Sequence, residues 1–155
     1  MPTPDFILEL RRHIGTAPLW LTGVTAVVLR GNQILLVRRA DNGAWTPVTG
    51  IVDPGEEPAV AAAREVLEEA DIVATPERLA SVFVTEMVVY DNGDRTQYLD
   101  LTFRFAYVSG EAHPADGENT EARWFDLDDL PAMSERMASR IRDALPERGE
   151  TLFQR

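Results

Sequence analysis

Three glutamates crowd one side of a short alanine-rich segment and limit what the chain can fold into. The segment runs from about Glu57 to Ala70, with Pro58 in the first turn of the expected helix, where proline is tolerated. Glu65 lies three residues before Glu68 and four before Glu69, so a helix directs all three carboxylates to one side. Like charges at this spacing destabilise a helix by about 0.2–0.5 kcal/mol each unless something neutralises them.

Two interpretations of this acidic side are open at this point. It is a solvated helix face, or it is a site for a hard divalent cation, because magnesium- and calcium-type ions prefer carboxylate oxygens. The glycine- and proline-bearing turn that precedes the helix, from Gly50 to Gly55, is part of a longer pattern that favours the cation site.

The composition indicates one folded domain and narrows its partners. The chain has 155 residues, 45% of them hydrophobic, and no cysteine, which excludes disulfides and thiolate zinc sites. Its net charge of −11 makes it a poor partner for nucleic-acid backbone or anionic lipid. Phosphorylated small molecules remain possible partners if divalent ions bridge the two sets of negative charge.

No apolar run reaches the roughly 18 residues that span a membrane. The N-terminal residues include acidic side chains and lack the order of a signal peptide. We therefore expect a cytoplasmic protein without a membrane partner.

The hydrophobic pattern predicts strands mixed with few helices, and hence a mixed sheet between helices. Met137, Ile141 and Leu145 form the expected packing face of a C-terminal helix. Strands are expected at residues 20–30, 33–39, 45–52, 80–90, 96–109 and 121–126, and helices at residues 5–14, 57–70 and 134–145.

The spacing of Gly50, Glu56 and the run Arg64–Ile72 resembles the Nudix box, G-x5-E-x7-R-E-U-x-E-E-x-G-U, where U is a bulky aliphatic residue. Every specified position matches except the last glycine, which is Asp71 here. The resemblance extends from about Leu21 to Pro131. Residues outside the box also match the family pattern: Arg38-Arg39 at a strand end, Trp45 before the box and Glu118 ahead of Trp124-Phe125.

The resemblance implies an α/β/α sandwich around a mixed β-sheet, as one domain over residues 1–155. Residues 1–18 are then an N-terminal helix extension, and residues 134–148 hold the C-terminal helix. A homodimer, common in the family, is possible.

The resemblance also implies an activity: Mg²⁺- or Mn²⁺-dependent hydrolysis of a diphosphate linkage in a nucleoside diphosphate joined to another group. Nucleoside triphosphates, ADP-ribose and dinucleoside polyphosphates all remain open as substrates, and no nucleic-acid polymer is expected. The alternative is a nucleotide-sensing module of the same fold that binds without hydrolysis.

By the same resemblance, metal ligands are expected at Glu65, Glu68, Glu69 and the carbonyl of Gly50. Glu68 and Glu69 are also expected to be catalytic, together with Arg64, which orients the glutamates, and Glu118. Glu111, Asp116 and Glu121 compete with Glu118 for that role. Arg38, Arg39 and Tyr90 are the expected substrate-binding residues.

Two departures concern the backbone at either end of the box. Thr49 stands where the family has a glycine, and Asp71 stands where a glycine commonly ends the helix in a left-handed conformation. Aspartate tolerates that conformation better than most residues, so modest strain is expected there.

Overall fold

The central strand of the computed structural model, which describes residues 3–155, is β1 (Leu19–Arg30). It pairs antiparallel with β2 (Gln33–Arg39) and β4 (Val48–Ile51), and parallel with β7 (Arg95–Gly110). All its residues from Val24 to Leu29 are buried, as expected of a strand with both faces covered.

The described residues form one nine-stranded mixed sheet, with the order β3-β2-β1-β7-β5-β9. Three strands lie off this path: β4 pairs with β1, β6 with β7, and β8 with β2. The remaining strands are β3 (Trp45–Thr46), β5 (Ile72–Val84), β6 (Val88–Val89), β8 (Asn119–Asp126) and β9 (Leu152–Phe153).

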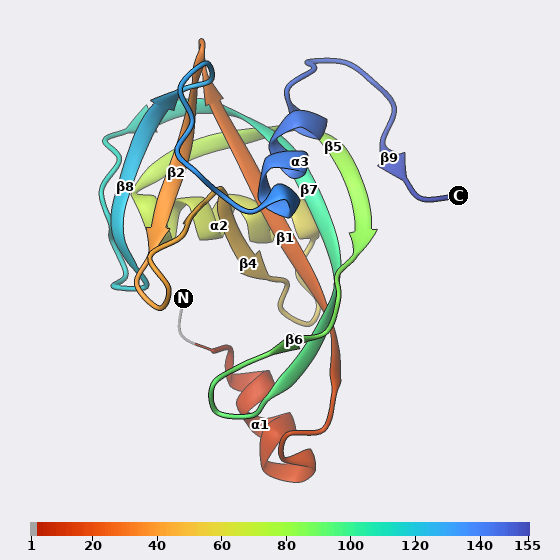
Figure 1. Ribbon diagram of the computed structural model, residues 1–155. Helices are drawn as coiled ribbons and strands as arrows, with labels where there is room; N and C mark the ends of the chain where they lie inside the picture. Colours follow the sequence, from red (N-terminus) through yellow and green to blue (C-terminus); the bar gives the residue numbers. More distant parts are fainter. Residues whose placement is uncertain (1–2) are drawn as a thin grey trace.

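Helices cover both faces of the sheet, which makes the α/β/α sandwich (Figure 1). α2 (Pro58–Ala70) lies behind the sheet in this view and α3 (Glu135–Ala144) in front. Because side chains alternate along a strand, Val28 packs into the cluster on the α2 side and Val27 into the cluster on the α3 side. The predicted fold class is confirmed.

The first helix, α1 (Asp5–Ile14), lies at the end of the molecule farthest from α3 (Figure 1). The guanidinium of Arg11 joins it to the sheet by donating to the carbonyl oxygen of Arg95 at 2.8 Å. Ile7 is the buried residue of this helix.

One strand prediction is wrong in its bounds. A strand was expected at residues 80–90, whereas β5 starts at Ile72 and ends at Val84, and only Val88–Val89 continue as β6. Pro76 lies in the early part of β5, and a proline within a run of residues argues against a strand. Register shifts near Pro76 let β5 stay paired with β7, as bulges commonly do.

The packing face of α3 also differs from the expected one. Leu145 is 37% exposed, while Ile141 and Ala144 are buried against the sheet. Arg140, on the same side, is buried as well, because its guanidinium bonds to Thr25 and faces Asp100. The packing face of α3 therefore includes the charged Arg140 and leaves out Leu145.

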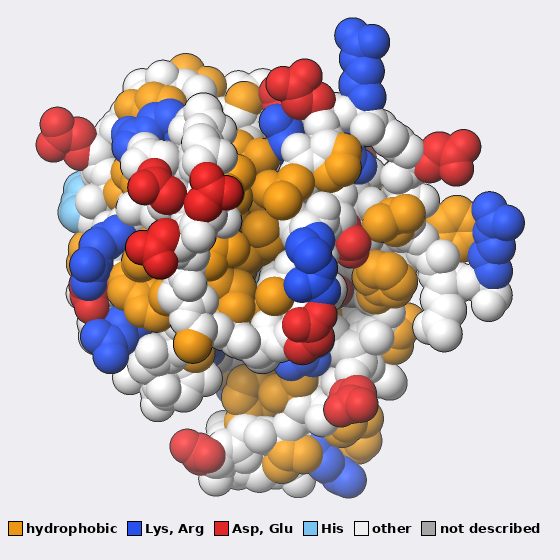
Figure 2. Space-filling view, turned by 45° about the horizontal axis from the view of Figure 1, so that its top comes forward, with side chains coloured by type: hydrophobic (Ala, Val, Ile, Leu, Met, Phe, Trp, Pro, Cys, Tyr) orange, Lys and Arg blue, Asp and Glu red, His pale blue; other side chains and the backbone are white. Residues whose placement is uncertain are grey.

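Among residues 3–155, each helix is too short or too polar to cross a membrane. Figure 2 shows acidic, basic and hydrophobic side chains interspersed on one face, with hydrophobic side chains around a hollow near its centre. Basic side chains on this face do not gather into one extended patch.

Candidate active site

α2 packs closely on the sheet because its inward side is made of small residues. Ala61, Ala62 and Ala70 are fully buried there. The close approach brings Glu65, which is also fully buried, against Gly50 of β4. A β-carbon on residue 50 would lie 2.2 Å from Cγ of Glu65, so this contact requires glycine.

Glu65 is a buried carboxylate with one oxygen unpaired. Arg64 donates to its Oε1 at 2.9 Å, whereas Oε2 is buried and has no hydrogen-bond partner. Burial raises the pKa of Glu65 to about 7, and the charge of Arg64 opposes that increase. An orphaned oxygen of this kind is what a bound cation would satisfy.

Arg64 connects three carboxylates. Its Nε and Nη2 donate to the two oxygens of Glu56 at 2.8 and 2.9 Å, and its Nη1 reaches Glu65 and, at 3.2 Å, Glu68. Paired, forked contacts of this type fix orientation as well as charge. Glu68 is 39% exposed on its side chain and stays accessible from solvent.

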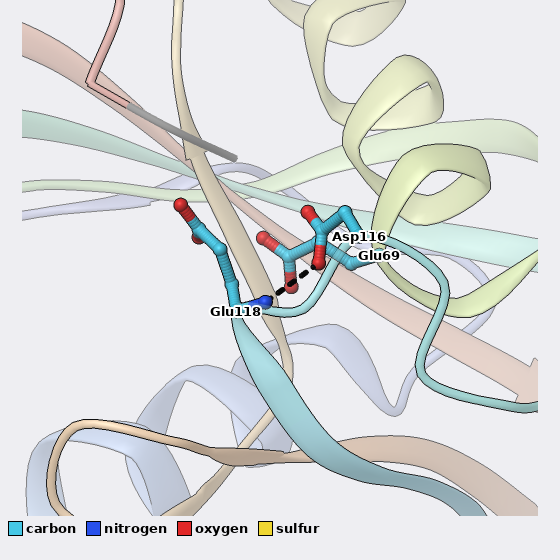
Figure 3. A group of neighbouring side chains, drawn as sticks. All are labelled: Glu69, Asp116 and Glu118. Atoms are coloured by element: carbon cyan, nitrogen blue, oxygen red, sulfur yellow. Dashed lines mark hydrogen bonds between the residues drawn. The ribbon is translucent and has the colours of Figure 1, made fainter.

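Glu69 faces a different group of carboxylates. One carboxylate oxygen from each of Glu69, Asp116 and Glu118 lies within 4.8 Å of the others (Figure 3). The loop that carries the last two is shaped by Asp116, whose Oδ1 accepts from the backbone N–H of Glu118 at 3.0 Å. Helix α2 and this loop thus bring the three carboxylates together.

Glu69 is only 5% exposed. Burial raises its pKa to about 8, and the hydrogen bond from Asn119 opposes that increase. The nearby charges of Glu65 and Asp116 raise the pKa further, so the two groups of carboxylates are electrostatically coupled.

A cavity of about 420 Å³ opens beside the carboxylates of Glu69 and Glu118. Arg39 lies in its wall together with Asp41, and the two side chains form a forked pair at 3.0 and 2.6 Å. The hydrogen bond to Asp41 is the main reason why the pKa of Arg39 is raised. The full lining is Val37, Arg39, Ala40, Asp41, Thr46, Thr49, Glu69, Glu118 and Asn119.

Two of the predicted substrate-binding residues lie outside this lining. Arg38 turns away from Arg39 along the strand and pairs with Glu121 at 3.0 Å. The hydroxyl of Tyr90 lies 2.7 Å from that of Tyr98, in the β6–β7 hairpin. Their roles stay predictions.

Sequence reasoning did not identify two residues of the site. Asp116 is visible in the sequence as an acid two positions before Glu118, but the sequence offers it only as a competitor of Glu118. Nothing in the sequence marks Asn119 as a site residue, because the direction of its side chain depends on strand geometry.

The departures from the box are accommodated. Thr49 lies within β4, paired with Thr25 of β1, and lines the cavity. Asp71 adopts the left-handed conformation, with φ of 54°, and its N–H donates to the carbonyl of Leu67 at 3.0 Å. It ends α2 as a glycine would.

The donor set suits a hard divalent cation. It is all oxygen, it includes the buried unpaired oxygen of Glu65, and it gathers several carboxylates that repel one another. Fold and site together define a class: an α/β/α domain that presents buried helix carboxylates beside a cavity.

Comparison with known proteins identifies that class. A model of the NUDIX domain matches residues 20–147, and the chain belongs to the Nudix hydrolase family. The predicted family and enzyme class are confirmed. The matched range exceeds the expected limit at Pro131 and takes in α3.

Three similar proteins illustrate the range. A MutT-like protein of Streptomyces ambofaciens is 34% identical, over 85% of this chain and 81% of its own. The NAD-capped RNA hydrolase NudC of Stutzerimonas stutzeri is 34% identical over 72% of this chain, which spans only 38% of that relative. A NUDIX hydrolase from Nitrosomonas europaea, 27% identical, superposes with a TM-score of 0.66 over 81% of this chain and 88% of its own.

Proposed function

We propose that this Nudix hydrolase cleaves a diphosphate linkage in a nucleoside diphosphate joined to another group, with Mg²⁺ or Mn²⁺ as cofactor. The observation that carries the proposal is the convergence of Glu69, Asp116 and Glu118 within 4.8 Å, beside a cavity that also holds Arg39. A relative from Methanocaldococcus jannaschii, 28% identical over 72% of this chain, is named ADP-ribose pyrophosphatase, which supports a phosphoanhydride substrate.

The residues that would hold the ions are Glu65, Glu68, Glu69 and the carbonyl of Gly50, with Glu118 and Asp116 completing the set from the loop. When bound, such ions neutralise phosphate oxygens and lower the pKa of a water molecule. Arg64 keeps two of these carboxylates, Glu65 and Glu68, in place through its hydrogen bonds and is itself held by Glu56.

Arg39 supplies the positive charge for a substrate phosphate at the cavity wall. Glu118 is exposed at the end of the loop, where water reaches it, and in this proposal it accepts the proton of the attacking water. Arg38 and Tyr90 stay candidates for contacts outside the cavity.

The substrate is tested with a panel of nucleoside triphosphates, ADP-ribose, NAD-type dinucleotides and dinucleoside polyphosphates, each with Mg²⁺ and with Mn²⁺. We expect metal-dependent cleavage at a phosphoanhydride, identified by chromatography of the products, and its loss in Glu69→Gln. Saturable binding in calorimetry with unchanged ligand recovered would instead identify a sensing module and refute the proposal.

A short NAD-capped RNA belongs in the same panel. The net charge of −11 weighs against a polyanionic substrate, whereas the NudC relatives are named for one. The expectation that no nucleic-acid polymer is a partner is therefore not confirmed. A single-domain homodimer also stays a prediction, checked by light scattering of the full chain.

A further inference from the structure

Asn119 is the first residue of β8 and is almost fully buried, at 7% exposed. Its side-chain amide Nδ2 donates to Oε2 of Glu69 at 2.9 Å, within the buried part of the site. A neutral donor bound to a buried carboxylate makes a charge-assisted hydrogen bond, which is stronger than one between neutral groups. Asn119 also lines the cavity.

An irregularity in β8 turns the side chain of Asn119 toward Glu69. Arg38 pairs with Glu121, but Arg39 pairs with Asn119, so Thr120 is an extra residue in the ladder. Arg38 lies on the face opposite the cavity, and Glu121 shares that face, where the two are ion-paired. In a regular strand, Asn119 would point the same way as Glu121, because side chains two residues apart share a face.

The bulge reverses that direction. Paired with Arg39, Asn119 faces the α2 side, where Glu69 lies. β-Bulges next to active sites commonly re-aim a side chain in this manner. The backbone N–H of Ala40 donates to the carbonyl of Glu118 at 2.9 Å, which holds the start of β8 against the end of β2.

We infer that Asn119 is a positioning residue of the site: its amide engages Oε2 of Glu69 and so presents the other oxygen to the cation. This inference rests on the proposed function for its kinetic consequence, but its effect on metal binding does not depend on turnover. Residues that hydrogen-bond a metal ligand typically contribute about 10- to 100-fold to metal affinity or activity.

The test uses Asn119→Ala in the full chain, with Asn32→Ala as a matched control. Asn32 also donates from Nδ2 to a carboxylate, that of Asp128 at 3.2 Å, but on the exposed surface. Mn²⁺ is titrated without substrate by electron paramagnetic resonance, and kcat and KM are measured on whichever substrate the wild type cleaves.

We expect Asn119→Ala to raise the Kd for Mn²⁺ about 10-fold and to lower kcat about 10- to 100-fold, with KM within about twofold. Asn32→Ala should leave all three values unchanged. Asn119→Leu, close in volume and without a donor, should behave like Asn119→Ala and serves if the alanine variant does not fold.

A folded Asn119 variant with wild-type Mn²⁺ affinity and kcat overturns the inference. A wild type that cleaves nothing in the panel refutes the proposed function instead, and the Mn²⁺ titration still decides the role of Asn119.

Discussion

Gly50 and Glu65 touch so closely that residue 50 has no room for a side chain. A β-carbon there would lie 2.2 Å from Cγ and 2.4 Å from Cδ of Glu65. Glu65 is fully buried, and Arg64 holds one of its oxygens, so its side chain has little freedom to withdraw. The first glycine of the box therefore leaves the space that the buried glutamate occupies.

Gly50→Ala is expected to displace Glu65 and to lower kcat at least 10-fold, while overpacking lowers the free energy of unfolding by about 1–3 kcal/mol. Metal-dependent hydrolysis and urea unfolding measure the two effects. Gly149→Ala is the control, because nothing lies within 4 Å of a β-carbon at that position. Wild-type activity in Gly50→Ala would show that Glu65 is not needed in this place.

Arg64→Lys should lower kcat about 10- to 100-fold with a small effect on stability. Lysine keeps the charge but cannot make the forked contact with both oxygens of Glu56 while also reaching Glu65. Arg12→Lys, at an exposed pair with Glu9, is the control and should be neutral. Equal kcat in the two variants would reduce Arg64 to an ordinary surface cation.

Arg39 is held by Asp41 at the cavity wall, so a substrate phosphate must compete with that carboxylate. Asp41→Asn is expected to lower KM about two- to fivefold by weakening the ion pair, whereas Arg39→Ala raises KM about 10-fold or more. Steady-state kinetics on the identified substrate measures KM for both variants. A KM that rises in Asp41→Asn would mean that Asp41 orients Arg39 for binding.

The spacing of the three glutamates predicts an acidic helix side, because a helix has a fixed period that converts sequence distance into direction. The structure divides that side, since Glu65 and Glu68 share Arg64, whereas Glu69 lies with Asp116 and Glu118. The hydrogen bond between Asn119 and Glu69 could not be predicted from residue spacing. It depends on the extra residue Thr120, and nothing in the local sequence distinguishes a bulge from a regular strand. Similarly, Pro76 reads as a break in the sequence, yet the long partner β7 keeps β5 paired across it.

The metal-free protein is expected to lose stability as pH rises from about 5 to 8. Burial raises the pKa of Glu65 to about 7 and that of Glu69 to about 8, from an ordinary value of 4.5. Between these values the folded state binds more protons than the unfolded state, so the free energy of unfolding falls with rising pH. The decrease ends once pH exceeds the folded-state pKa values.

Urea unfolding in a chelator at pH 5, 6, 7 and 8 measures this slope. The double variant Glu65→Gln/Glu69→Gln should show a flatter profile, since neither amide titrates. Adding Mg²⁺ should stabilise the wild type more at pH 8 than at pH 5, because metal binding requires the charged carboxylates. A wild-type profile that rises with pH would contradict the burial effect.

Asp100 and Arg140 join α3 to the sheet through a buried ion pair. They are 7% and 8% exposed, and Nε of Arg140 lies 3.4 Å from Oδ2 of Asp100. Arg140→Met leaves Asp100 buried without its counter-charge and should lower the free energy of unfolding by about 3–5 kcal/mol. Adding Asp100→Asn to this variant should recover part of the loss, because the unpaired charge is then removed. Arg142→Met, at an exposed pair with Glu135, is the control. Chemical denaturation of the wild type, Arg140→Met, Asp100→Asn and the double variant gives the coupling energy of the pair. A double variant no more stable than Arg140→Met alone would mean that α3 is held chiefly by its apolar contacts.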